Sequence, residues 1–193
     1  MRFLFYSTKV TLYFLTLTFS VLISSCGGGG NNSLNEPLPP PDPQPTTPPT
    51  TEIPLSERKY ITQTIDGQQV ERTYLIRYPE EISKSSYPVV FFFHGAGGNG
   101  QDWFNNHPEV ENLIDQEQFI GIFPDGYENR WNVGTETNAD DVEFITLIVN
   151  DFGANELFNT EKLYGVGTSN GAGLANKIGK ETSLFEGIAP LIS

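Results

Sequence analysis

Cysteine, histidine and positive charge are all scarce in this sequence. Its 193 residues include one cysteine, two histidines, and 11 lysines and arginines against 24 aspartates and glutamates, for a formal net charge of −13. A single cysteine excludes an internal disulfide framework and a thiolate metal cluster, and no histidine or cysteine spacing is typical of a metal site. Nucleic acid is excluded as a partner because its phosphate backbone requires a basic face. No cofactor is indicated.

The N-terminus has the composition of a targeting segment. An apolar stretch at residues 10–23 follows two basic residues and is too short to span a bilayer as a mature helix. The letters ISSC at residues 23–26 resemble the end of a bacterial lipoprotein signal, with residues 1–25 removed and Cys26 lipidated. An ordinary secretory signal with an incidental cysteine is the alternative. The resemblance implies an extracytoplasmic protein anchored to a membrane of the cell envelope by acyl chains.

Residues 26–55 contain almost nothing that could build a core. Glycines follow Cys26, and the segment EPLPPPDPQPTTPPTTEIP (36–54) is rich in proline and threonine. Too little apolar surface can be buried to offset the entropy of ordering, so an extended, polyproline-like spacer is predicted. A proline-rich motif for a partner protein is the alternative. The folded domain is then expected over residues 56–193.

An α/β sheet is predicted for this domain. Two antiparallel strands are expected within residues 58–79, joined at Asp66 and Gly67, because Asp-Gly is a strong hairpin signal. Four further segments are predicted to be parallel strands: VVFFF (89–93), FIGIFPDG (119–126), KLYGVGTS (162–169) and FEGIAPLIS (185–193). VVFFF is apolar at every position, as expected of a strand that is buried on both faces.

Helices are predicted between these strands, which together give strand–helix units. The first covers residues 108–118, the second begins after a cap at Asp140, and the third covers residues 170–180. Asp140 and Glu143 have the spacing of a capping box. The expected apolar faces are Val110, Leu113 and Ile114 in the first helix, and Val142, Ile145, Val149 and Phe152 in the second.

Ser169 lies between two glycines in GTSNG (167–171), where a predicted strand must turn abruptly into a helix. Open α/β sheets bind ligands at that edge. A nucleophile on such a turn has a strained backbone, so the residues two positions away must lack bulk, as Gly167 and Gly171 do. Amides at the start of the helix would stabilise negative charge there. The alternative is a loop serine between two glycines required for packing.

A second glycine-rich segment, HGAGGNG (94–100), follows VVFFF. Acyl transfer produces an oxyanion, which backbone N–H groups must stabilise at a fixed place. We expect one donor from Asn170, directly after the serine, and one from Ala96, each contributing roughly 3–4 kcal/mol. His94 is interpreted as a residue that holds the loop by hydrogen bonds rather than as a catalytic base.

With these segments in place, the sequence resembles the α/β-hydrolase superfamily, and within it the secreted esterases that include feruloyl esterases and polyhydroxybutyrate depolymerases. The matching motifs are HGAGG (94–98), FPDG (123–126), RWN (130–132), ADDVEFI (139–145) and GTSNGAG (167–173). The resemblance implies a Ser–His–Asp hydrolase that forms an acyl-enzyme on Ser169, with the Ala96 and Asn170 amides as oxyanion hole. Its substrates would be feruloyl or acetyl esters of polysaccharides, or polyhydroxyalkanoate-type esters.

The same resemblance leaves two interpretations for Trp131. It is either a wall of the substrate cleft or a buried anchor of its loop. Asp140 and Asp141 are interpreted as a helix cap and a loop tie, not as catalytic acids.

The residues after Ser169 depart from this pattern. In this fold the catalytic order is serine, then an acid, then histidine, but neither aspartate nor histidine follows Ser169. The expectation is therefore that this chain is the N-terminal part of a longer gene product, with an α/β-hydrolase domain that ends after about the sixth strand and is nearly inactive by itself. The alternatives are a catalytically dead α/β-hydrolase that binds a ligand at the cell surface, and an amidase or peptidase on the same scaffold.

Overall fold

The computed structural model describes residues 53–153 and 155–191. The predicted signal segment, Cys26 and the proline-rich segment up to residue 52 lie outside the described residues. Within the described part of the chain, no helix has both the length and the apolar character needed to cross a membrane.

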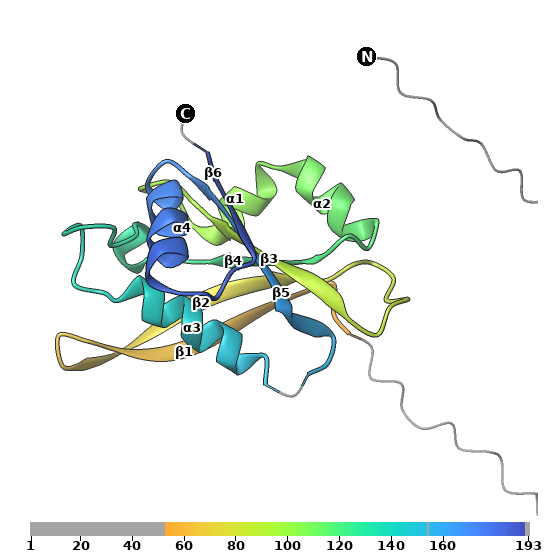
Figure 1. Cartoon of the computed structure of the whole chain (residues 1–193), viewed down its shortest axis with the longest axis horizontal. Helices are drawn as coiled ribbons and strands as arrows, with labels where there is room; N and C mark the ends of the chain where they lie inside the picture. The colour runs from red at the N-terminus through yellow and green to blue at the C-terminus, as the bar shows by residue number, and fades with distance from the viewer. Residues whose placement is uncertain (1–52, 154, 192–193) are drawn as a thin grey trace, which may run out of the picture. The chain divides into compact units, whose positions relative to one another are not determined.

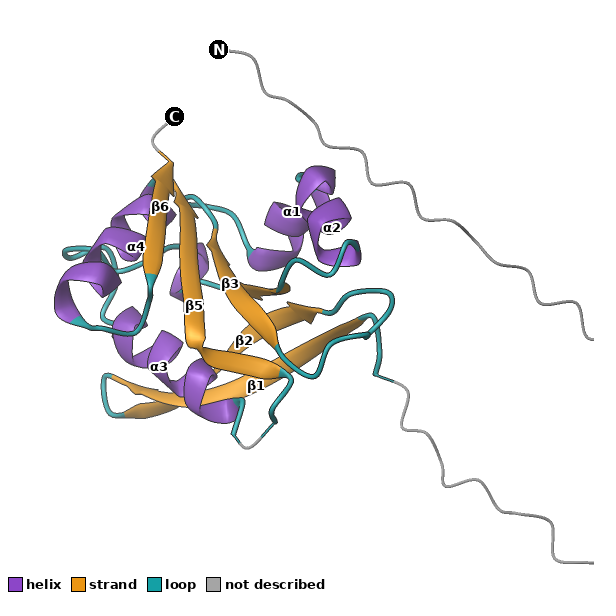
Figure 2. Ribbon diagram, turned by 45° about the vertical axis from the view of Figure 1, so that its right-hand side comes forward, coloured by secondary structure: helices purple, strands orange, loops and turns teal. Residues whose placement is uncertain are grey.

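A mixed sheet of six strands forms the centre of the domain (Figures 1 and 2). Its strands are β1 (Ser56–Ile65), β2 (Gln68–Arg77), β3 (Tyr87–Phe93), β4 (Ile120–Pro124), β5 (Phe158–Thr168) and β6 (Gly187–Leu191), in the order β1-β2-β4-β3-β5-β6. β2 is antiparallel to β1 and to β4, whereas β4, β3, β5 and β6 are parallel to one another. The predicted antiparallel pair and the four parallel strands are thus confirmed.

The turn between β1 and β2 follows from two residues. Asp66 and Gly67 both have positive φ angles, of 51° and 75°, and the flanking residues Ile65 and Gln68 are paired. Two central residues with positive φ are the signature of a type I′ hairpin turn, whose twist matches that of the strands. The predicted Asp-Gly hairpin is confirmed.

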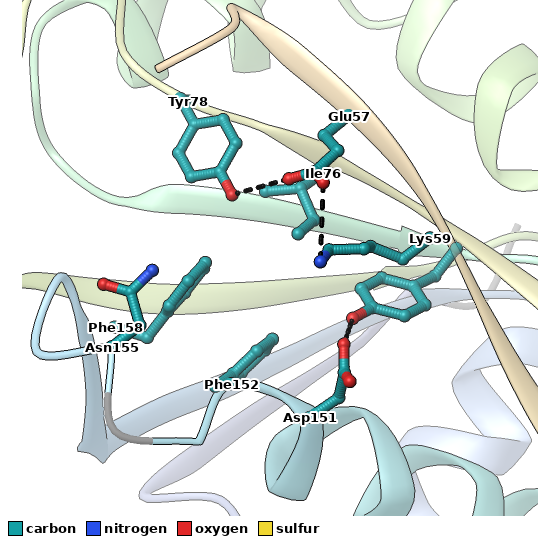
Figure 3. Close-up of a pocket in the computed structure, with 9 residues that line it drawn as sticks. Glu57, Lys59, Ile76, Tyr78, Asp151, Phe152, Asn155 and Phe158 are labelled. Carbon is teal, nitrogen blue, oxygen red and sulfur yellow. Dashed lines mark hydrogen bonds and ion pairs between the residues drawn. The ribbon is translucent and has the colours of Figure 1, made fainter. Parts of the chain in front are cut away.

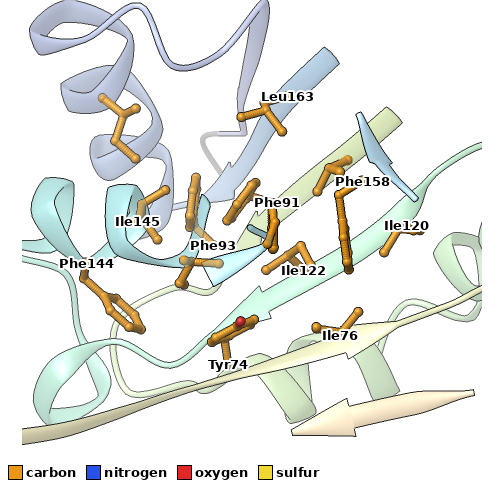
Figure 4. Packing of buried hydrophobic residues seen from close by; sticks show 14 of the residues in the cluster. Tyr74, Ile76, Phe91, Phe93, Ile120, Ile122, Phe144, Ile145, Phe158 and Leu163 are labelled. Carbon is orange, nitrogen blue, oxygen red and sulfur yellow. The ribbon is translucent and has the colours of Figure 1, made fainter. Parts of the chain in front are cut away.

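Helices cover both faces of the sheet. On one face, α3 (Asp141–Asp151) and α4 (Asn170–Glu181) pack against a core that includes Phe91 and Phe93 (Figure 4). On the other face, α1 (Gly100–Asn105) and α2 (Pro108–Asp115) pack against a smaller core that includes Phe92. Successive side chains of β3 therefore enter different cores, which explains why every position of VVFFF is apolar.

The predicted faces of two helices need correction. In α2, Val110 and Ile114 are buried, but Leu113 is 42% exposed because only a narrow stripe of this short helix contacts the sheet. At α3 the expected Ile145 and Phe152 are buried, as are Phe144 and Ile148, which were not expected. The expected Val142 and Val149 pack against the core but are only partly buried.

A buried charge explains why α3 buries a different face from the one predicted. Asp141 lies on the same side of this helix as Phe144 and Ile145 and has no exposed surface, because it pairs with Arg72 of β2. A pattern that counts only apolar residues does not place an aspartate at the centre of the buried face. The short helix α1, which begins after an Asn99 side chain that accepts a hydrogen bond from Asp102 N, was not predicted.

Candidate active site

Ser169 is exposed on a tight turn between β5 and α4. Its φ of 53° and ψ of −116° lie in a region that non-glycine residues rarely adopt, at a cost of about 1–3 kcal/mol. Three backbone hydrogen bonds hold this conformation: Ser169 N donates to Leu191 O (3.0 Å), and Ser169 O accepts from Ala172 N (2.9 Å) and Gly173 N (3.2 Å). The strained residue is therefore held by β6 and by the first turn of α4.

The two glycines of the turn contact neighbouring backbone. A Cβ atom on Gly171 would lie 2.3 Å from Phe93 O and 2.6 Å from His94 O, and one on Gly167 would lie 2.1 Å from Gly171 O. Backbone atoms cannot move aside as the end of a side chain can, so neither position accepts a larger residue. This close approach places the start of α4 against the end of β3, at the point where the loop 94–100 begins.

His94 begins that loop and is buried. Its Nε2 accepts a hydrogen bond from Gly126 N (2.9 Å), so its Nδ1 carries the proton and donates to Gly95 O (2.7 Å). Burial lowers the pKa of His94, which keeps the ring neutral at pH 7. Both ring nitrogens are occupied, so His94 holds the loop as predicted and has no free nitrogen with which to act as a base.

The segment 125–131 holds the loop 94–100 at its start, middle and end. The three contacts are Gly126 N to His94 Nε2 (2.9 Å), Gly97 N to Asn129 O (2.7 Å) and Gly100 N to Asp125 Oδ1 (2.7 Å). Because β3 and β4 are neighbours in the sheet, the segments that leave their carboxyl ends meet directly. A loop with five glycines and alanines among its seven residues is in this way given a fixed shape.

Asn170 and the loop that carries Ala96 both lie near Ser169. Asn170 directly follows Ser169, and a Cβ atom built on Gly95, which precedes Ala96, would lie 3.6 Å from Ser169 Cβ. Ala96 is exposed. Neither amide donates a hydrogen bond to another atom of the described chain. The structure thus brings Ser169, the loop that carries Ala96 and the start of α4 together.

Trp131 has no exposed surface. Its Nε1 donates to His94 O (2.8 Å), and its backbone N and O pair with the side-chain amide of Asn170, at 2.7 and 3.0 Å. The environment of Trp131 is therefore that of a buried loop anchor. The alternative, a wall of the substrate cleft, is wrong for this residue because a side chain without accessible surface cannot line a cleft.

Asp140 and Asp141 have the structural roles that the sequence predicts. Asp140 Oδ1 accepts a hydrogen bond from Glu143 N (3.0 Å) and so caps α3. Asp141 accepts from Arg72 Nη2 (2.8 Å) with one oxygen and from Asn132 N (2.6 Å) with the other. Both carboxylates are thereby engaged in holding the fold.

The partners of these aspartates were not predicted. Arg72 is buried, donates to Gln63 Oε1 (2.7 Å), and lies over the ring of Phe144 at 4.0 Å. Gln63 in turn donates to Glu143 Oε2 (3.0 Å). This bond replaces the second contact of the expected capping box, in which Glu143 would accept from the backbone N–H of Asp140. The only signal in the sequence was that Gln63 and Arg72 lie at inward positions of the predicted hairpin strands.

A separate cavity of about 260 Å³ lies between β1, β2 and the segment that follows α3 (Figure 3). Its polar groups satisfy one another: Tyr74 Oη donates to Asp151 (2.6 Å), Tyr78 Oη donates to Glu57 (3.3 Å), and Lys59 pairs with Glu57 (3.4 Å). The cavity is lined by the first residue of β5, whereas Ser169 follows the last, so the two lie at opposite ends of that strand. Among the described residues, no cluster of histidine, cysteine, aspartate and glutamate could hold a metal ion.

Comparisons with known proteins support the α/β-hydrolase fold that the sequence predicts. No family model matches the chain. An acetylxylan esterase of Coprinopsis cinerea is 27% identical over 139 residues, which cover 68% of this chain and 37% of that protein. This chain therefore corresponds to little more than a third of the length of that relative.

Two solved structures are similar to the domain. The fluorophosphonate-binding serine hydrolase FphF of Staphylococcus aureus superimposes with a TM-score of 0.55 at 10% identity, over 70% of this chain and 56% of that one. An acetyl xylan esterase from Aspergillus awamori gives 0.52 at 18% identity, over 69% and 53%. At these identities the likeness shows the fold alone. The domain has the α/β-hydrolase fold.

Proposed function

We propose that this protein is a serine carboxylic-ester hydrolase that works through an acyl-enzyme. The observation that carries the proposal is the backbone of Ser169, which is exposed and strained at the end of β5, next to Asn170 and close to the loop that carries Ala96. The amides of Asn170 and Ala96 have no acceptor in the described chain. A strained serine at a strand-to-helix turn is the arrangement that presents a nucleophile in this fold. The similarity to an acetylxylan esterase supports esters as the substrate.

In the proposed reaction, Ser169 Oγ attacks the carbonyl carbon of the ester. The oxygen that becomes negative is stabilised by the Ala96 and Asn170 amides and by the positive end of the α4 dipole. Collapse of the tetrahedral intermediate breaks the ester C–O bond, the alkoxide takes the proton that the base removed from Ser169 and leaves as the alcohol, and the acyl group stays on Ser169. Water then attacks the acyl-enzyme, releases the acid and restores the serine.

Attack by the serine requires a general base that accepts the hydroxyl proton. His94 cannot serve, because its Nε2 accepts from Gly126 and its Nδ1 donates to Gly95 O. The match covers only 37% of the length of the acetylxylan esterase. We therefore propose to measure hydrolysis on the full-length gene product and not on this chain alone.

We further propose acetyl or feruloyl esters of polysaccharides as the substrate class, and attachment of the domain to the cell envelope through lipidated Cys26. The acetylxylan esterase relative supports the first part. Release of acetate from acetylated xylan, compared with release of ferulate from a feruloylated oligosaccharide, decides between the two acyl groups.

The direct test is hydrolysis of p-nitrophenyl acetate by the full-length gene product. The Ser169→Ala variant is expected to lower kcat by at least about 10⁴-fold, because loss of the nucleophile removes the acyl-enzyme route. Ser183→Ala, which changes another exposed serine, is the matched control and should retain kcat. A Ser169→Ala enzyme with the wild-type rate would show that the proposal is wrong.

A further inference from the structure

We propose that Asp125 is a positioning residue whose carboxylate fixes the end of the loop 94–100 and, through it, the Ala96 amide. The inference rests on the proposed function, in which that amide stabilises the oxyanion. Asp125 directly follows β4. This strand is the neighbour of β3, from whose end the loop 94–100 begins. It was not among the functional residues that the sequence predicts.

The carboxylate of Asp125 is held by the hairpin and directed at the loop. Its Oδ2 accepts hydrogen bonds from Arg58 Nη1 (3.1 Å) and from the hydroxyl of Thr73. Its Oδ1 accepts a hydrogen bond from Gly100 N (2.7 Å). The backbone N–H of Asp125 also donates to Thr73 O (2.9 Å). Both the backbone and the carboxylate of Asp125 are therefore held by contacts that do not involve the loop.

Gly100, the last residue of the loop, has no freedom to move toward β4. It is buried, and a Cβ atom on it would lie only 2.2 Å from Phe123 O. Its amide has one acceptor in the described chain, the Asp125 carboxylate. Loss or displacement of that acceptor would leave a buried N–H unpaired, and the chain would shift to pair it with water or another group.

Two consecutive residues therefore hold both ends of the loop. Gly126 N binds the His94 ring at the start, and the Asp125 carboxylate binds Gly100 at the end. Ala96 lies between these two fixed points, and its amide faces no acceptor of the described chain. Because an oxyanion donor must be in place before the charge develops, a small displacement of this loop should lower the rate of the chemical step.

Two substitutions separate the position of the oxygen from the charge. Asp125→Asn keeps an acceptor oxygen at the position of Oδ1 and removes the charge, whereas Asp125→Glu keeps the charge and displaces the oxygens by one methylene. In p-nitrophenyl acetate hydrolysis by the full-length gene product, we expect Asp125→Asn to keep kcat within about threefold. Asp125→Glu should lower kcat by about 10–100-fold with KM within about twofold, because an interaction made only in the transition state is weakened.

Arg58→Ala is the matched control, because it removes the ion pair of Asp125 and a long contact to Gln101 Oε1 (3.5 Å) but leaves the bond from Gly100 N to Asp125 in place. It should keep kcat within about twofold. An equal loss of kcat in Arg58→Ala and Asp125→Glu would overturn the inference, since the ion pair and not the Gly100 contact would then matter. A wild-type kcat in Asp125→Glu would overturn it as well.

Amide hydrogen exchange reports the contact without any activity. The Gly100 amide should be protected in the wild type and in Asp125→Asn, and should exchange at least about tenfold faster in Asp125→Glu; equal protection in all three would contradict the inference. Should Asp125→Glu fail to fold, Asp125→Asn decides: retained kcat with a protected Gly100 amide supports the inference, and a tenfold loss of kcat overturns it. Ser169→Ala is measured in parallel. Retained hydrolysis in Ser169→Ala would reject the proposed function, whereas the exchange rate of the Gly100 amide tests the contact with Asp125 independently of that function.

Discussion

The turn at Ser169 and the loop 94–100 that faces it are both rich in glycine, but they are held in different ways. In the turn, a Cβ atom on Gly171 would lie 2.3 Å from a carbonyl oxygen of the backbone. In the loop, a Cβ atom on Gly97 would meet nothing within 4 Å, and the residue is glycine because its φ is +82°. Close packing of backbone atoms fixes the turn at Gly171, whereas hydrogen bonds from the segment 125–131 fix the loop around Gly97, where packing leaves space.

The difference shows that glycines in two adjacent motifs can be required for separate reasons. Lack of space excludes every side chain, whereas a positive φ only disfavours side chains, by about 1–2 kcal/mol. The nucleophile is accordingly placed by backbone contacts, because Gly171 packs against Phe93 and His94 and Ser169 N donates to Leu191 O. The oxyanion loop, in contrast, depends on side chains that lie far away in the sequence, such as His94 with Gly126 and Asp125 with Gly100.

The largest effect is expected for Gly171→Ala. The added methyl group would overlap Phe93 O and His94 O, so the end of β3 and the start of α4 must separate. We expect a loss of about 3 kcal/mol or more in the free energy of unfolding, as for strongly overpacked sites. Urea unfolding followed by circular dichroism measures it.

Gly97→Ala should have a smaller effect. The methyl group has room, and the cost is that of a positive φ, about 1–2 kcal/mol. Gly134→Ala is the control, because Gly134 has no positive φ and its nearest neighbour would be 3.7 Å away, so stability should not change measurably. A Gly97→Ala variant as unstable as Gly171→Ala would break the comparison, since the loop would then also be fixed by packing.

The smallest effect is the pH dependence that His94 gives to the loop. Burial lowers the pKa of His94 from its ordinary value of 6.5, so the unfolded chain takes up this proton at a higher pH than the folded one. Above pH 6.5 neither state is protonated and His94 contributes nothing to the pH dependence. As the pH falls below 6.5, the free energy of unfolding should decrease, by at most about 1.4 kcal/mol per pH unit.

This window is separate from that of the carboxylates. The lowered pKa values of Glu117 and Glu136 affect stability only below their ordinary value of 4.5. Urea unfolding between pH 5 and 7 should therefore show the slope in the wild type and in His107→Gln, and a flat curve in His94→Gln. A slope that persists in His94→Gln would contradict the assignment.

The strands and the turn at Ser169 could be predicted because their signals are local. An Asp-Gly pair forms a two-residue turn, a continuous apolar run becomes a strand buried on both faces, and glycines two residues on either side of a serine mark a sharp bend. These three features depend on residues that are close together in the chain.

The features that were missed depend on contacts between distant segments. The sequence does not decide whether Trp131 is exposed or buried, because the acceptor of its indole N–H, the His94 carbonyl, lies far away in the chain. The buried face of α3 could not be placed without Arg72, which pairs with Asp141 from another element. Asp125 has no local signal of its role, because the loop that it contacts leaves a neighbouring strand.

Reaction of the full-length gene product with a fluorophosphonate, followed by mass spectrometry of its peptides, tests the central claim most directly. Such reagents phosphonylate serines that are activated for nucleophilic attack. We predict one adduct, on Ser169, which is absent in Ser169→Ala and present in Ser183→Ala. The absence of an adduct on Ser169, or an adduct on another serine that persists in Ser169→Ala, would contradict the assignment of Ser169 as the nucleophile.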